Sequence, residues 1–320
     1  MFLDTTYTNG VIAVKEKSLL KEKIFRLCEV GIDEAFRMLL ESGFGGMATE
    51  NLYQYEQLID AETSALDTFI NTYAPSQAER VYFLLPRDFH NAKALIKAKF
   101  LGENADKMLA PNGLFDVETL RNCVQNGNYK NIDDCPELAK ACKESEDVLQ
   151  EQPLGMKVGE IFEKYLYQAL YVRVKKNRTL RNVLAIKADM TNVLIAFRSK
   201  DEKTANAQYL PCGTLTNAQL SSLSKDDADK IRAKYDGELK TFISLCLDAR
   251  EKGLPYVEAE KYRDRYEEKL FDGRKFDLVR NEPFLYYVYR KKMEIANVRI
   301  VMACLLAGLD ETQIKNRLRK

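Results

Sequence analysis

One short motif recurs three times along the chain and restricts what it can fold into. Each copy is an acidic residue, two further residues and an asparagine, and the acids are 101 and 105 residues apart (189 − 88 and 294 − 189). Apolar residues one and four positions after each acid continue a helical stripe. Matched order and spacing indicate an old threefold duplication of a helical unit. The three copies are Asp88/Asn91, Asp189/Asn192 and Glu294/Asn297.

A second repeated pattern follows the first two copies of the motif. A Pro-x-Gly turn places Gly113 25 residues after its acid and Gly213 24 residues after its own. Both turns lead through a leucine to a polar residue that predicts the N-cap of a short helix. Gly102 and Gly308 each stand 14 residues after the acid of the first and third copies. We expect the helices that carry the motif to stop at these glycines.

The acid and the asparagine of one copy lie on neighbouring turns of a helix, where they can meet each other or a facing element. One interpretation is a satisfied polar pair at the edge of a buried face, and the other is a catalytic carboxylate. The catalytic interpretation needs a second group, and none stands nearby in the sequence. We therefore expect three equivalent structural pairs, each fixing how the helix of one bundle meets its neighbour.

The helical period appears along almost the whole chain, whereas no run alternates like a strand. The sequence therefore predicts an all-α fold of three similar helical bundles. We divide it into units 1–105, 106–205 and 206–320 of one continuous assembly. The clearest expected helices are 11–28, 33–43, 50–73, 155–175, 181–200, 238–251, 255–271, 283–306 and 310–319.

Composition narrows the functional classes. Hydrophobic residues make up 46% of the chain, with 15 glycines and 8 prolines, as in a packed helical protein. The 49 basic and 48 acidic residues argue against a dedicated nucleic-acid binder, but leave room for a local basic patch. The N-terminus does not resemble a signal peptide, and no apolar run reaches the roughly 18 to 20 residues that span a bilayer. We expect a soluble chain that can still dock on a membrane protein.

Familiar catalytic and metal-binding patterns are missing. The seven cysteines are scattered without a two-residue gap, and we interpret them as reduced cytosolic thiols. With His90 as the only histidine, histidine-based zinc sites and Ser-His-Asp or Cys-His catalysis are poorly supported. The segment ESGFGGMATE lacks the lysine and hydroxyl of a phosphate loop, so we interpret it as a connecting loop. We expect no catalytic residue, metal or cofactor, and the partner-binding residues stay unknown.

Basic stretches leave two interpretations open. The segments YYVYRKKME and GLDETQIKNRLRK are either solvated faces or a surface for an acidic partner. The segment YLYQALYVRVKKNRTLR interleaves tyrosines with cations, which fits either nucleic acid or a basic helix end with its turn. Its members are Tyr165, Tyr167, Tyr171, Arg173, Lys175, Lys176, Arg178 and Arg181.

The two ends of the chain resemble a known family. EIANVRIVMACLLAGLDETQIKNRL, after a P..YY..R lead-in, is similar to the ending of the C subunits of V/A-type rotary ATPases, the family that includes the d subunit of the eukaryotic vacuolar enzyme. The stretch YTNGVIAVKEKSLLKEKIFRLCEVGIDEAFRMLLESGFGG is similar to that family's opening hairpin. The internal motifs match the threefold pseudo-symmetry known for the family.

The resemblance implies a non-catalytic coupling piece shaped as a funnel of three bundles. It would seat on the membrane proteolipid ring at the cytoplasmic side and receive the foot of the central rotor shaft. It would pass torque for ATP-driven proton or sodium transport, or for ATP synthesis. Neither nucleic acid nor a small-molecule substrate would be a partner.

Two other classes remain open. One is a cytosolic all-α scaffold or adaptor unrelated to rotary ATPases. The other is an RNA binder, which would lose affinity when Lys175, Lys176 and Arg178 are neutralised. The sequence does not distinguish proton from sodium transport, or a pump from a synthase.

Overall fold

The computed structural model describes residues 4–151, 155–272 and 280–319. Within these ranges every regular element is a helix, which confirms the predicted all-α class. The chain forms two compact units, and each is described by itself. Unit 1 combines Met1–Arg80 with Asp264–Lys320, and unit 2 is Val81–Arg263. The proposed division into three bundles, with its boundaries at 105 and 205, stays a prediction.

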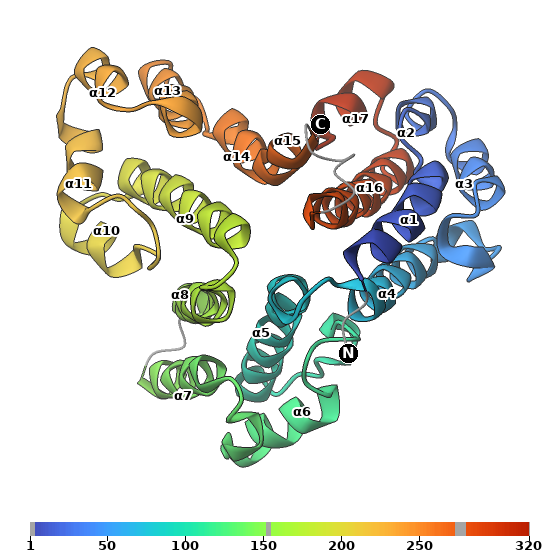
Figure 1. The fold of residues 1–320 in the computed structure, drawn as a ribbon, viewed down its shortest axis with the longest axis horizontal. Coiled ribbons are helices and arrows are strands. Elements are labelled where there is room, and N and C mark those ends of the chain that lie inside the picture. Colours follow the sequence, from blue (N-terminus) through green and yellow to red (C-terminus); the bar gives the residue numbers. More distant parts are fainter. Residues whose placement is uncertain (1–3, 152–154, 273–279, 320) are drawn as a thin grey trace. The chain divides into compact units, whose positions relative to one another are not determined.

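Unit 1 is built around α16, which contacts all the other principal helices of the unit. Figure 1 shows this red helix beside blue helices from the opposite end of the sequence. The long helix α5 starts in this unit and continues into unit 2. The helices are α1 (Thr5–Lys15), α2 (Lys23–Leu27), α3 (Ile32–Glu41), α4 (Glu56–Tyr73), α15 (Tyr266–Asp272), α16 (Glu282–Leu306) and α17 (Glu311–Arg317).

The apolar stripe of α16 forms the core of unit 1. Ile295 and Val298, one and four positions after the acid of the third motif, are both buried. Further towards the start of the helix, Tyr287 and Phe284 contact Phe69 of α4, with ring centroids 4.9 and 5.8 Å apart. Such aromatic pairs add to the gain from burial itself. Residues at three- and four-residue spacing thus join α16 to the N-terminal half of the unit.

The predicted helix over 11–28 is wrong in its middle. α1 ends at Lys15, a short 3₁₀ turn follows over Glu16–Ser18, and α2 begins only at Lys23. Lys21 has a left-handed φ of 46°, and the Leu20 amide donates to a carboxylate of α16 instead of continuing a helix. A tertiary hydrogen bond therefore overrides the local helical pattern. The predicted helix over 255–271 is likewise divided into α14 and α15.

Unit 2 is centred on α9, which contacts α8, α10, α11 and α13, while α7 pairs with α8. α5 joins this group through Phe89, whose ring lies 6.2 Å from that of Phe162 on α8. The helices are α5 (Gln77–Leu101), α6 (Val117–Asn126), α7 (Pro136–Glu151), α8 (Gly155–Val174), α9 (Arg178–Arg198), α10 (Glu202–Gln208), α11 (Asn217–Lys225), α12 (Ala228–Lys234), α13 (Gly237–Glu251) and α14 (Val257–Asp264).

The predicted helix ends at the two glycines are confirmed. Gly102 and Gly308 have left-handed φ values of 69° and 72°, just beyond the ends of α5 and α16. After each glycine the next amide returns to a carbonyl five residues earlier, as in a Schellman C-cap. The N-caps expected after the two Pro-x-Gly turns are Asp116 and Thr216, whose side chains accept from the first turns of α6 and α11.

Two further observations concern the sequence predictions. All seven cysteines are free, and six of them are buried. Among the described residues, no helix combines the length and the apolar character that crossing a membrane requires.

Candidate functional site

The repeated motif lies on the three long helices α5, α9 and α16. Its acid and asparagine side chains are buried in all three copies, with relative exposures of 8% or less. A buried polar group costs free energy unless it is hydrogen-bonded, so the partners of these six side chains define the site.

Each asparagine binds the backbone of a single residue further along the chain. Its amide nitrogen donates to the carbonyl of that residue, and its amide oxygen accepts from the N–H of the same residue. We call this two-bond arrangement the asparagine clamp. The clamps join Asn91 to Ala110 (both 2.8 Å), Asn192 to Leu210 (3.0 and 2.7 Å) and Asn297 to Arg319 (3.0 and 2.9 Å).

The clamp fixes the segment that returns after each long helix. The partner residues stand 18 to 22 positions after the asparagine, just outside the helical ladder. Of these partner residues Leu210 is buried, Ala110 is half-buried and Arg319 is exposed. A buried N–H or C=O group left without a partner costs about 1 to 3 kcal/mol, so the clamp matters most at Leu210. The same two hydrogen bonds occur in all three copies of the motif.

In the first two copies the acid anchors the turn that follows the clamp. Asp88 accepts from the amides of Leu114 and Phe115 at 2.9 and 3.1 Å. The acid and asparagine of one copy therefore bind successive parts of the same returning segment rather than each other.

Asp189 repeats this arrangement and adds a bond. Its Oδ1 accepts from the amides of Thr214 and Leu215 at 2.8 and 2.9 Å, and its Oδ2 accepts from the Thr214 hydroxyl at 2.6 Å. The turn is thereby held directly before the N-cap of α11.

Lack of space for a side chain explains why Gly113 and Gly213 are glycines. A Cβ at Gly113 would lie 2.1 Å from Oδ1 of Asp88, and one at Gly213 would lie 2.4 Å from Oδ1 of Asp189. Neither position is a left-handed one, so the requirement is space for the carboxyl group and not backbone freedom. The repeated Pro-x-Gly pattern in the sequence therefore corresponds to a turn that approaches the acid closely.

The third copy binds a different segment. Glu294 accepts from the amide of Leu20 at 2.5 Å and from Nζ of Lys291 at 2.6 Å. The donor thus comes from the N-terminal segment, although Asn297 still clamps Arg319 near the other end of the sequence. The third motif joins parts of the chain that are 274 residues apart.

A buried ion network surrounds this third acid, and the sequence analysis missed it. Lys291 is only 7% exposed and forms ion pairs with Glu294 and with Glu62 of α4. Glu62 also accepts from the amide of Gly45 at 2.9 Å. We call Glu62, Lys291 and Glu294 the buried triad. A lysine three residues before the acid was the available signal, but nothing in the sequence indicates Glu62.

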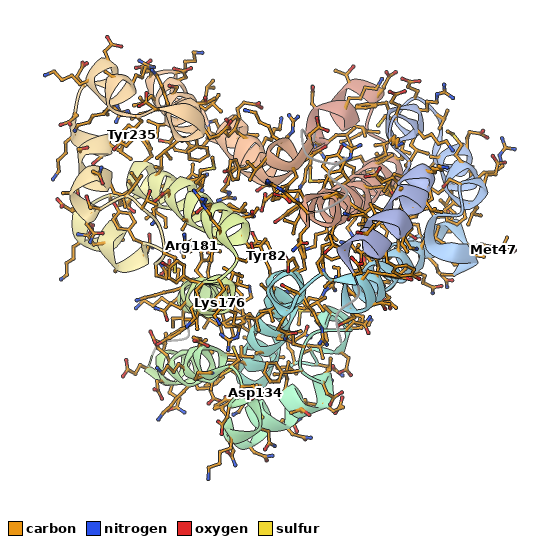
Figure 2. All side chains as sticks on the ribbon, in the orientation of Figure 1. Met47, Tyr82, Asp134, Lys176, Arg181 and Tyr235 are labelled. Carbon is orange, nitrogen blue, oxygen red and sulfur yellow. The ribbon has the colours of Figure 1, made fainter. Side chains whose placement is uncertain are left out.

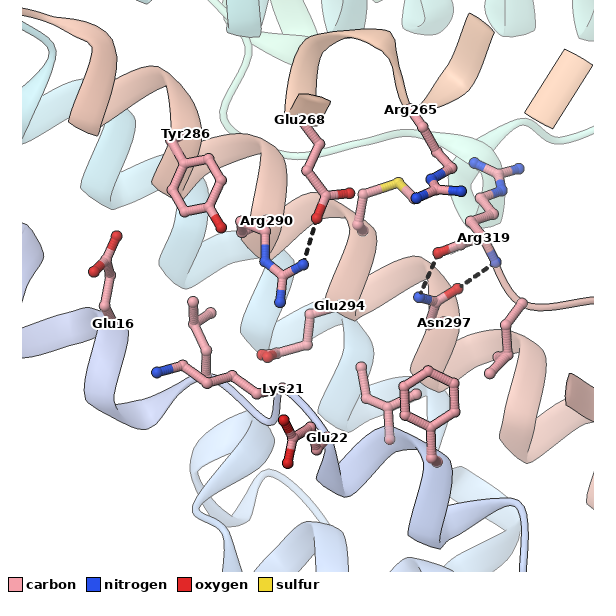
Figure 3. A pocket seen from close by; sticks show the side chains of 15 residues that line it. Glu16, Lys21, Glu22, Arg265, Glu268, Tyr286, Arg290, Glu294, Asn297 and Arg319 are labelled. Carbon is pink, nitrogen blue, oxygen red and sulfur yellow. Dashed lines mark hydrogen bonds and ion pairs between the residues drawn. The ribbon is translucent and has the colours of Figure 1, made fainter. Parts of the chain in front are cut away.

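A cavity of about 600 Å³ lies in unit 1, and Glu294 of the buried triad is part of its lining (Figure 3). It is lined by residues of α2, α15 and α16, of the segment before α2 and of the segment after α17. Arg290 pairs with Glu268 in its wall, and Asn297 and Arg319 form their clamp at its edge. Cations and acids both line it, so it has no evident charge selectivity. Within the described ranges, no cluster of three or more His, Cys, Asp or Glu residues could hold a metal.

Burial perturbs two of the motif acids. It raises the pKa of Asp88 to about 6, while the bonds from Leu114 and Phe115 act in the opposite direction. It also raises the pKa of Glu294, with the charge of Lys291 acting against it. Perturbed acids are candidates for chemistry. Both, however, are engaged by backbone amides, which is the arrangement of structural anchors.

Two other candidate positions also have local partners. His90 is exposed, and its Nε2 lies 2.9 Å from the carbonyl oxygen of Met108. The glycine-rich segment connects α3 to α4, and Gly43, Gly45, Gly46 and Met47 have left-handed φ values. A Cβ at Gly45 would lie 2.6 Å from the Cα of Leu58, so this loop is pressed against α4.

A comparison with known protein families gives a match over nearly the whole chain. The family model for the C/AC39 subunit of ATP synthases matches residues 8–317, a range that includes all three motifs. The chain belongs to this family. The resemblance that the sequence predicted is therefore confirmed over nearly its whole length.

Curated relatives, all of them C subunits, agree with this assignment at low identity. The chain is 20% identical over 279 residues to that of the V-type sodium ATPase of Enterococcus hirae, covering 83% of this chain and 82% of the relative. It is 24% identical to that of the V-type ATP synthase of Thermus thermophilus, covering 98% and 97%. It is 22% identical to that of the A-type ATP synthase of Methanocaldococcus jannaschii, covering 98% and 85%.

Proposed function

We propose that this protein is a non-catalytic central-stalk subunit of a V/A-type rotary ATPase. It acts as a socket that couples the rotor shaft to the membrane proteolipid ring, at the cytoplasmic side of the membrane. The family match over residues 8–317 is the observation that carries this proposal. Names of relatives include a sodium ATPase and ATP synthases, so the transported ion and the direction of operation stay open.

The three motifs suit a part that transmits torque. A torque-bearing body must resist bending where its long helices meet their connecting segments. Each of the three long helices here, with 21 to 25 residues, is tied to a returning segment by an asparagine clamp. Buried hydrogen bonds open less readily than exposed ones. This supports a stiff adaptor rather than a flexible linker.

The two alternative classes have less support. An unrelated cytosolic scaffold would have no reason to match an ATP synthase subunit over its full length. The aromatic spacing that suggested RNA is not a stacking surface, because Tyr165 and Tyr167 are half-buried and the Tyr165 hydroxyl bonds to Glu144 at 2.8 Å.

The test is a depletion and add-back experiment in membrane vesicles from cells that make the complex. Without this subunit, we expect ATP hydrolysis by the head to continue while ATP-driven ion uptake is lost. Purified wild-type protein should restore uptake. The Gly159→Ala variant should restore uptake equally well, because a Cβ there meets nothing within 4 Å.

A second readout identifies the partners. Tagged protein pulled down from detergent-solubilised membranes should bring both the shaft subunits and a small proteolipid. Ion uptake that survives depletion, or a pull-down that contains neither partner, would refute the socket role and favour a scaffold.

A further inference from the structure

The corner between α8 and α9 carries a group of four exposed cations. Lys175 and Lys176 follow the end of α8, and Arg178 and Arg181 lie in the first turn of α9. All four side chains are exposed, and in the described part of the chain none of them forms an ion pair or side-chain hydrogen bond. Figure 2 labels Lys176 and Arg181 on this corner. We call these four residues the basic corner.

Helix stability does not explain the basic corner. Cations at the C-terminal end of α8 interact favourably with its dipole, but Arg178 and Arg181 stand at the N-terminal end of α9, where the dipole disfavours them. The first turn of α9 contains no acid to compensate. Four like charges within seven residues also repel one another. An anion outside the chain would relieve both effects.

Apolar side chains border the basic corner. Tyr171 and Val172 are 40% and 50% exposed and lie in the last turn of α8, directly before Lys175 and Lys176 in the chain. Arg173 between them turns inward instead and pairs with Glu137 at 2.9 Å. The exposed surface therefore combines four cations with one aromatic and one aliphatic side chain.

We propose that the basic corner binds the anionic headgroups of a phospholipid membrane, with Tyr171 and Val172 at the interface. Clusters of four or more cations are attracted to anionic leaflets, and tyrosine is favoured at headgroup level. A single exposed aromatic offers little stacking surface for nucleic acid. This contact goes beyond the socket role, because it involves lipid directly rather than the proteolipid ring. It would add a second attachment beside the protein contacts.

The predicted affinity is weak for the isolated chain. Each cation near an anionic surface contributes about a fivefold gain in partitioning, so four give several-hundredfold. Binding should therefore need millimolar accessible lipid, and become strong only when another attachment holds the protein at the membrane.

The test is sedimentation of the full chain with sucrose-loaded vesicles at low salt. One vesicle type is pure phosphatidylcholine, and the other contains about a third phosphatidylglycerol. The test variant changes Lys175, Lys176, Arg178 and Arg181 to Gln. The matched control changes Lys200, Lys230, Lys240 and Lys252 to Gln, which lowers the net charge equally, from +1 to −3, at exposed sites elsewhere in unit 2.

Phosphatidylglycerol-dependent binding that falls at least tenfold in the test variant, persists in the control and weakens with added salt would support the proposal. Equal loss in both variants would show an effect of net charge alone and overturn it. Equal binding to both vesicle types, or none at millimolar lipid, would also overturn it. Capture by polyglutamate or an oligonucleotide without vesicle binding would assign the corner to an acidic protein or to nucleic acid. None of these results affects the socket test.

Discussion

The steric fit between Gly213 and Asp189 gives a sharp prediction. In the Gly213→Ala variant the new Cβ would lie 2.4 Å from Oδ1 of Asp189, whereas a nonbonded carbon and oxygen stay at least about 3 Å apart. The turn and the carboxyl group must separate by more than half an ångström. The amides of Thr214 and Leu215, now 2.8 and 2.9 Å from that oxygen, would then pass the limit of a good hydrogen bond.

The magnitude follows from these bonds. Each hydrogen bond to the carboxyl group contributes about 1 to 2 kcal/mol net, so the loss of two lowers the free energy of unfolding by about 3 kcal/mol. For unit 2, Val81–Arg263, which has about 180 residues, this corresponds to a fall in Tm of roughly 6 to 12 °C.

Thermal and urea unfolding followed by circular dichroism would measure the change. Gly159→Ala is the control, since its Cβ meets nothing within 4 Å in the helix α8. Alanine is the better helix former there, so the control should gain up to about 1 kcal/mol. The two variants make the same chemical change in the same unit, but are expected to change the free energy of unfolding in opposite directions.

A double-mutant cycle tests the cause. When Asp189→Ala removes the carboxyl group, the clash disappears and Gly213→Ala should cost less than about 1 kcal/mol. A coupling of about 2 kcal/mol or more is expected. If the costs of the two changes simply add, or if Gly213→Ala leaves stability unchanged, the steric reasoning is wrong.

Three further predictions concern buried polar groups. Asn192→Leu should lower the free energy of unfolding by about 2 to 5 kcal/mol, because two backbone groups lose their hydrogen-bond partner. The control Asn182→Leu, at an exposed position of the same helix, should stay within about 0.5 kcal/mol of wild type. Equal effects of the two changes in urea unfolding would contradict the clamp. Lys291→Met should lower the free energy of unfolding by about 3 to 5 kcal/mol at pH 7, since two carboxyl groups of the buried triad lose their cation. The loss of unfolding free energy should be smaller at pH 4. A loss that does not depend on pH would argue against the ionic explanation. Burial raises the pKa of Asp88 from 3.8 to about 6, so its contribution to stability is greatest below pH 3.8 and falls by about 3 kcal/mol as the pH rises through 6. The stability difference between wild type and Asp88→Asn, followed by urea unfolding from pH 3.5 to 7, should shrink accordingly; a difference that grows with pH would refute the shift.

Much of the fold could be predicted because its signals are local. The helical period fixed most elements, and the glycine stops after α5 and α16 follow from backbone sterics within a few residues. The motif spacing identified the six acid and asparagine residues, and the repeated Pro-x-Gly pattern identified the glycines of the two turns. What these side chains bind was not predictable, because the clamped carbonyls and amides belong to backbone that any residue could supply.

Two of the failures share one physical source. The segment over 16–22 has a helical sequence pattern, yet Leu20 donates its amide to Glu294, so a contact across the chain decides the local conformation. Glu62 of the buried triad is one acid among 48, and only the packing of α4 against α16 brings it to Lys291. Single-sequence patterns report periodicity but not such long-range pairings.

The difference between the third motif and the other two follows from chain connectivity. The bonds of Asp88 and Asp189 close loops of about 26 residues, whereas the bond from Leu20 to Glu294 closes 274. Loop-closure entropy grows as 1.5RT ln n, which makes the longer closure about 2 kcal/mol more costly. The third site has what the others lack, namely a glutamate, longer by one methylene, and the ion pairs of Lys291. We therefore interpret the buried triad as the compensation for assembling unit 1 from the two ends of the sequence.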